Sequence, residues 1–219
     1  MKAVLFDLDN TLVDFHALKD ECVKAMASAM HDAGLKRSQE SIAKRLWELY
    51  DEHGWEDQTI LQKYFEKEFG SVDWRILAHA VVEYRKIKAS RLEPYANVKK
   101  TLLRLRERGL RLGVVSDAPR LQAWIRLAEL DLDDCFDFVV SFDDTGEKKP
   151  SSKPFERALA LLKLTASEVL FVGDSAHKDI EGAAKAGMKT CLALYGNGEA
   201  DGAKADCEIA SFEDLLALV

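Results

Sequence analysis

The sequence predicts an α/β fold, a Rossmann-like three-layer α/β/α core with a parallel sheet that is interrupted by an inserted four-helix-bundle cap. Two observations lead to this prediction. Short apolar runs recur along the 219 residues, at 3–6, 112–115, 138–142, 169–172 and 190–194, and amphipathic helical patterns separate most of them. Residues 15–92, in contrast, carry helical patterns with no strand pattern among them. Strands that alternate with helices are typical of a parallel sheet covered on both faces.

The first run, residues 3–6, is continuous and apolar, and acidic residues follow it at once. A short uninterrupted apolar run is the pattern of a strand buried on both faces. Later in the chain, Val98, Leu102 and Leu105 share one face of a predicted helix, and Gly109 follows as a stop signal. The same kind of stripe comes before the fourth strand, at Phe155, Leu159 and Leu162.

The insertion contains four apolar stripes at helical spacing. They begin at Leu18, Ile42, Leu61 and Trp74 and predict the core of a helix bundle rather than a cofactor site. We therefore expect an α/β core from residues 1–14 and 93–219, and an inserted helical module from residues 15–92. A cluster of glycines from Gly196 to Gly202 predicts a loop near the C-terminus.

Composition excludes several classes of partner. The formal charge is −7, so bulk electrostatic binding to nucleic acid or to an anionic membrane is not expected. No apolar run approaches the roughly 18 residues of a membrane span, and the N-terminal apolar run is too short for a signal peptide. The four cysteines are scattered, as in a protein with reduced thiols. We expect a cytoplasmic protein, either a monomer or a homodimer.

Polar residues follow four of the predicted strands. In an open α/β sheet the carboxyl ends of the strands meet at the ligand site, so these residues should lie close together. Clustered carboxylates with no His or Cys suit Mg²⁺, and a hydroxyl and an ammonium suit an anion. This combination indicates phosphoryl transfer through an aspartyl-phosphate. The residues concerned are Asp7 and Asp9, Ser116 and Asp117, Lys149, and Asp174 with Asp179.

These four segments, taken in order, resemble the motifs of the haloacid dehalogenase superfamily of phosphatases and phosphotransferases. The first motif is Asp7-Leu-Asp9-Asn-Thr, the second ends at Ser116, the third is Lys149-Pro150, and the fourth runs from Gly173 to Asp179. The resemblance covers nearly the whole chain. The helical insertion after the first motif resembles the C1-type cap of subfamily I.

The resemblance implies a role for each matching residue. Asp7 would be the nucleophile, and Asp9 would protonate the leaving oxygen and later deprotonate the attacking water. Mg²⁺ would be held by the carboxylate of Asp7, the backbone carbonyl of Asp9 and Asp174, with Asp179 as an outer ligand. Ser116 and Lys149 would hold the phosphate.

Two positions invite comment. The second motif of the family often continues with Asn, whereas this chain has Asp117, an extra negative charge beside a phosphate site. Lys149 is preferred over its neighbour Lys148 because it directly precedes Pro150. In the cap, the candidates for substrate binding are His16, Lys19 and Trp55. The simpler interpretation is that Lys19 is a solvated surface lysine and that His16 is a structural histidine.

The function expected is that of a phosphoric monoester hydrolase acting on a small phosphorylated metabolite. Asp9 argues against dehalogenation, because a halide leaving group needs no acid. A phosphosugar mutase of the same superfamily is the alternative, and a non-catalytic protein on this fold is a third class. The pattern leaves open which metabolite is the substrate.

Overall fold

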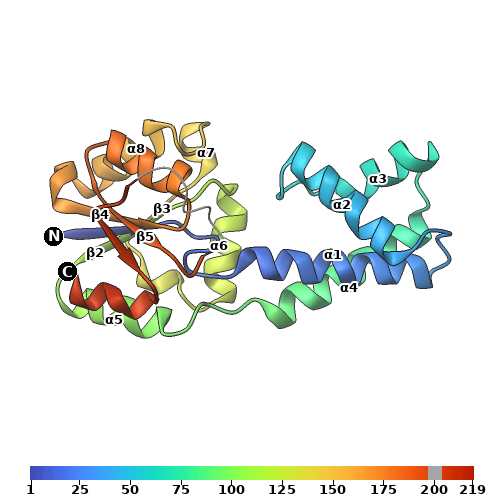
Figure 1. Cartoon of the computed structure of the whole chain (residues 1–219), viewed down its shortest axis with the longest axis horizontal. Helices are drawn as coiled ribbons and strands as arrows, with labels where there is room; N and C mark the ends of the chain where they lie inside the picture. The colour runs from blue at the N-terminus through green and yellow to red at the C-terminus, as the bar shows by residue number, and fades with distance from the viewer. Residues whose placement is uncertain (197–203) are drawn as a thin grey trace. The chain divides into compact units, whose positions relative to one another are not determined.

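The computed structural model describes residues 1–196 and 204–219 (Figure 1). The chain folds into two compact units. The first unit comprises Met1–Phe15 and Leu92–Val219, and the second comprises His16–Arg91. Most of the predicted glycine-rich loop, residues 197–202, lies outside the described residues. Within the described ranges, no helix is both long and apolar enough to cross a membrane.

The first unit is built on a parallel six-stranded sheet with the order β3-β2-β1-β4-β5-β6. Because β2 lies on one side of β1 and β4 on the other, the chain reverses direction across the sheet at β1. The carboxyl ends of β1 and β4 therefore flank the place where ligands bind in such sheets. The strands are β1 (Ala3–Phe6), β2 (Arg111–Val115), β3 (Phe138–Val140), β4 (Val169–Gly173), β5 (Lys189–Ala193) and β6 (Cys207–Ile209).

Helices cover both faces of this sheet, as the apolar strands require. Figure 1 shows α5 (Val98–Glu107) on one face, and α7 (Phe142–Thr145) and α8 (Ser152–Leu162) on the other. Leu5 belongs to the core beside α8, where the rings of Phe155 and Phe171 meet edge to face. The next residue, Phe6, packs against Phe136 and Phe212. Two further α-helices in the described part of this unit are α6 (Arg120–Glu129) and α9 (Glu181–Lys185), and short 3₁₀ or π turns lie at Asp133–Cys135, Ala166–Glu168, Ala176–Ile180 and Phe212–Ala217.

Two strands differ from the sequence prediction. The run at 138–142 is a strand only as far as Val140, because Ser141 caps the short helix α7 through its hydroxyl and the carboxylate of Asp144. The last strand, β6, was not predicted. Only three residues long, it pairs with β5 at the edge of the sheet, and so short a run carries little periodicity.

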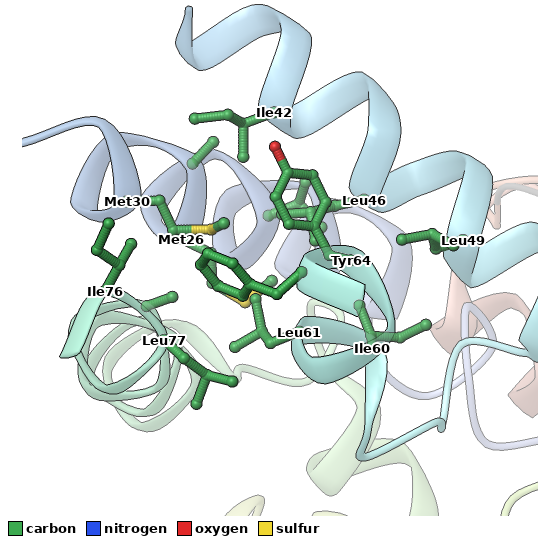
Figure 2. Close-up of a cluster of buried hydrophobic side chains, with 14 of the residues drawn as sticks. Met26, Met30, Ile42, Leu46, Leu49, Ile60, Leu61, Tyr64, Ile76 and Leu77 are labelled. Carbon is green, nitrogen blue, oxygen red and sulfur yellow. The ribbon is translucent and has the colours of Figure 1, made fainter. Parts of the chain in front are cut away.

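The second unit is built from four helices, and only the first residue of α1, Phe15, belongs to the first unit. The helices are α1 (Phe15–Asp32), α2 (Gln39–His53), α3 (Ile60–Phe69) and α4 (Trp74–Arg91). Figure 2 shows side chains from all four helices meeting in one core, among them Met26, Leu46, Tyr64 and Leu77. The hydroxyl of Ser38 caps the start of α2, and Gly70 in a left-handed conformation ends α3. The insertion after β1 is thus helical throughout its regular structure.

Candidate active site

Three aspartates converge at the carboxyl ends of β1 and β4. Oxygen atoms of Asp7, Asp174 and Asp179 all lie within 4.8 Å of one another, and the three residues are buried. Asp7 continues the pairing of β1, since its N–H donates to the carbonyl of Val172 at 2.9 Å. Gly173 makes room for the third carboxylate, because a Cβ at this position would overlap the side chain of Asp179. Among the described residues, this is the group of carboxylates arranged to hold a metal ion.

The ammonium of Lys149 enters this group from the loop between α7 and α8. It contacts the carboxylate of Asp7 and donates to Oδ1 of Asp179 at 2.7 Å. The side chain of Lys149 is only 3% exposed. Burial by itself would lower the pKa of Lys149, but the carboxylates of Asp179 and Asp7 raise it well above its ordinary value. Lys149 is therefore a permanent cation in the site.

The carboxylates carry more negative charge than Lys149 can neutralise. Burial and the neighbouring carboxylate of Asp179 raise the pKa of Asp174 to about 6. Burial also raises the pKa of Asp7 well above its ordinary value, with Asp179 and Asp174 adding to the effect and Lys149 opposing it. Three ionised carboxylates beside one ammonium leave an excess of two negative charges. A divalent cation with a preference for oxygen would balance that excess, so the donor set fits Mg²⁺.

The side chain of Asp9 is paired with an arginine. Asn10 adopts a left-handed conformation with φ 61°, and the chain turns there after leaving β1. Nη1 of Arg126, on α6, donates to Oδ2 of Asp9 at 3.1 Å. Sequence reasoning missed Arg126. Its signal was an arginine on the buried stripe of a helix, between Ala123 and Leu127.

Ser116 and Asp117 follow β2, as expected. The hydroxyl of Ser116 accepts from the N–H of Ala118 at 3.1 Å, and this contact fixes its oxygen near the end of the strand. Oδ1 of Asp117 accepts from the backbone N–H of Lys149 at 2.9 Å. The carboxylate of Asp117 thus ties the second motif to the third.

The loop after β5 also reaches the site, which sequence reasoning did not anticipate. The hydroxyl of Tyr195 donates to the carbonyl of Thr11 at 3.0 Å. A Cβ at Gly196 would overlap the side chain of Asp174 and the carbonyl oxygen of Asn10. Glycine at this position therefore permits a close approach of backbone to the carboxylate group.

The three candidates in the helical unit lie close together. The imidazole of His16 stacks on the ring of Trp47, with 5.7 Å between centroids, and its centroid is 5.4 Å from that of Trp55. Lys19 is buried, donates to the carbonyl of Trp55 at 2.8 Å and lies over the ring of Tyr50. This cluster contains both aromatic rings and a cation, and Trp47 is the member that the sequence did not single out.

The chain is similar to proteins of known classification. Residues 1–187 match the model of the haloacid dehalogenase-like hydrolases. A glyceraldehyde 3-phosphate phosphatase from Methanothermobacter thermautotrophicus is 34% identical over 192 residues, which cover 88% of this chain and 85% of that protein. A phosphoglycolate phosphatase from Aquifex aeolicus is 31% identical and covers 100% of this chain and 96% of its own length. The crystal structure of a phosphatase from Thermococcus onnurineus superposes with a TM-score of 0.73 at 27% identity, covering 100% of this chain and 97% of that one.

Proposed function

The chain belongs to the haloacid dehalogenase-like hydrolase family, and from this premise we propose that it is a Mg²⁺-dependent phosphatase of small phosphomonoesters. The observation that carries the proposal is the carboxylate of Asp7 at the end of β1, in contact with Lys149 and grouped with Asp174 and Asp179. A carboxylate nucleophile beside a permanent cation and a divalent-metal donor set is suited to phosphoryl transfer.

In the first half of the reaction, a carboxylate oxygen of Asp7 attacks the phosphorus atom of the substrate. The bond from phosphorus to the leaving oxygen breaks, and that oxygen takes a proton from Asp9. Lys149 and the hydroxyl of Ser116 bind the phosphate oxygens, and Asp117 keeps the backbone of Lys149 in place.

In the second half, Asp9 removes a proton from water as the water oxygen attacks the phosphorus of the aspartyl-phosphate. Phosphate leaves, and Asp7 is restored. Mg²⁺ would be held by the carboxylates of Asp7 and Asp174 and by the backbone carbonyl of Asp9, with Asp179 as an outer ligand. When bound there, Mg²⁺ would neutralise part of the negative charge on the transferred phosphoryl group.

For the substrate, we propose a two- or three-carbon phosphate, with glyceraldehyde 3-phosphate first and phosphoglycolate second. The support is the sequence identity between this chain and the phosphatases of these two substrates, in alignments that cover most of this chain and most of each relative. His16 and Trp55 in the helical unit are the side chains proposed to meet the organic part of the substrate. Lys19 is proposed to hold the segment of Trp55 through the hydrogen bond to its carbonyl. Location in the cytoplasm is part of the proposal, supported by four cysteines that are all free thiols.

The test is release of inorganic phosphate from a panel of phosphorylated metabolites, with Mg²⁺ and with EDTA. Hydrolysis of a short sugar or glycolyl phosphate that depends on Mg²⁺ supports the proposal. An isomerised product without phosphate release would point to the mutase alternative. Absence of turnover in a folded protein that binds Mg²⁺ would contradict an enzymatic role.

A further inference from the structure

Arg126 is a buried guanidinium to which the proposed reaction assigns no task. It lies on α6, is 2% exposed, and is the largest of the fully buried side chains among the described residues. Burying a guanidinium is costly unless an anion compensates it. Its contacts should therefore indicate why the site retains a charge at this position.

The segment after β1 supplies two contacts to the guanidinium. Nη1 donates to Oδ2 of Asp9 at 3.1 Å, and Cζ lies 3.9 Å from the centroid of the Phe15 ring. The ring and the carboxylate together restrict the orientation of the guanidinium. In turn, this fixed donor restricts the rotation of the Asp9 side chain, which is 25% exposed.

We propose that Arg126 is a positioning residue for Asp9. This inference rests on the proposed function, because it assumes that Asp9 is the acid and base of the reaction. By donating to Oδ2, Arg126 fixes the orientation of the Asp9 carboxylate at the end of β1. As the phosphorus–oxygen bond breaks, the proton moves from Asp9 to the leaving oxygen, and the carboxylate that remains keeps its charge-assisted hydrogen bond to Arg126.

The experiment compares two substrates with different leaving groups. Arg126→Met removes the charge and keeps the aliphatic stem, whereas Arg126→Lys keeps the charge and shortens the reach. An alkyl phosphate such as glycerol phosphate requires protonation of its leaving oxygen, but p-nitrophenyl phosphate requires little. For Arg126→Met we expect kcat to fall about 100-fold with the alkyl phosphate and less than about 3-fold with p-nitrophenyl phosphate, with KM nearly constant. Arg126→Lys should lie between this variant and the wild type.

Arg120→Met is the matched control. Arg120 begins the same helix, is exposed and pairs with Asp144, so its loss should leave kcat unchanged for both substrates. An equal loss with both substrates in Arg126→Met would overturn the inference, because a purely structural role does not distinguish leaving groups.

A second measurement covers the case in which Arg126→Met does not fold. Asp9→Asn removes the negative charge that pairs with the buried guanidinium of Arg126, while Asp7→Asn leaves Lys149 paired with Asp179. In metal-free buffer we expect Tm of Asp9→Asn to lie roughly 3–6 °C below that of Asp7→Asn. Equal values would overturn the inference. Failure of the wild type to release phosphate from either substrate would instead contradict the proposed function, and the comparison of Tm would still test the ion pair.

Discussion

Lys149 and Asp179 form an ion pair in which both side chains are almost completely buried, with 2.7 Å between Nζ and Oδ1. The same ammonium also contacts the carboxylate of Asp7. A buried charge is tolerated when it is paired and hydrogen-bonded, and removing one partner leaves the other without compensation. Lys149 is thus as much a part of the folded structure as of the proposed chemistry.

Lys149→Met is expected to abolish phosphatase activity and to lower the free energy of unfolding by about 3–5 kcal/mol at pH 7, because Asp7 and Asp179 lose their cation. Urea unfolding followed by circular dichroism measures the second effect. The matched control is Lys148→Met at the adjacent, exposed position, where we expect a change within about 0.5 kcal/mol. Similar losses in both variants would show that the buried pairing is not what stabilises this loop.

Asp7→Asn is expected to reduce kcat by more than about 1000-fold while the fold is kept, because the amide has nearly the same shape but is not a nucleophile. Phosphate release and circular dichroism measure the two effects. The raised pKa of Asp7 indicates that its ionised form is disfavoured without metal, so the variant should be no less stable than the wild type in EDTA. Near-full activity in Asp7→Asn would refute the proposed aspartyl-phosphate.

The metal-free protein is expected to lose stability as the pH rises from about 4 to about 7. Burial and Asp179 raise the pKa of Asp174 to about 6 in the folded state, from an ordinary value of 3.8. Because the pKa of Asp174 is higher in the folded state, the folded protein binds more protons than the unfolded chain. The contribution of Asp174 to the free energy of unfolding is therefore complete below the unfolded pKa and is lost as the pH rises through the folded pKa. Mg²⁺ binds the ionised carboxylates and should raise Tm more at pH 7 than at pH 5.

Tm measured across this range in EDTA and in Mg²⁺ tests this prediction. Asp174→Asn is the control, and its Tm in EDTA should depend less on pH. A wild-type Tm that rises with pH between 5 and 7 in EDTA, or an equal gain from Mg²⁺ at both values, would contradict the assigned charge balance.

Much of the fold could be predicted because its causes are local. Residues 3–6 form a strand buried on both faces, and that environment leaves an uninterrupted apolar run in the sequence. Asp7 and Asp174 could be placed at one site because parallel strands end at the same edge of their sheet. The limits of β3 and the existence of β6 depended instead on a cap at Ser141 and on pairing with β5.

The partners within the site could not be predicted, because they join residues far apart in the sequence. The side chain of Asp9, for example, pairs with Arg126, which is 117 positions away. Nothing near Asp117 in the sequence indicates that its carboxylate accepts from the N–H of Lys149. Such contacts follow from the packing of loops on a finished sheet.

The contact of Asp117 leads to a prediction with two variants. Asp117→Asn can keep the hydrogen bond to Lys149 through its carbonyl oxygen and removes a negative charge, so KM should stay constant or fall. Asp117→Ala loses the hydrogen bond, and we expect kcat to fall about 10-fold because Lys149 is less well positioned. Steady-state kinetics of the two variants tests this difference. Equal kinetics in both would mean that charge, rather than the hydrogen bond, is what Asp117 contributes.

Gly196 provides a test of the carboxylate group that does not depend on turnover. A methyl group at this position would overlap Asp174 and the carbonyl of Asn10, so Gly196→Ala must displace one of them. We expect the affinity for Mg²⁺ to fall about 10–100-fold, as when a residue that orients a ligand is disturbed. Isothermal titration with Mg²⁺ measures this directly. Leu194→Ala, on the same loop but 48% exposed, is the control and should bind Mg²⁺ like the wild type. If Gly196→Ala binds Mg²⁺ with unchanged affinity, Asp174 either moves without consequence or is not a ligand, and the proposed metal site is wrong at that residue.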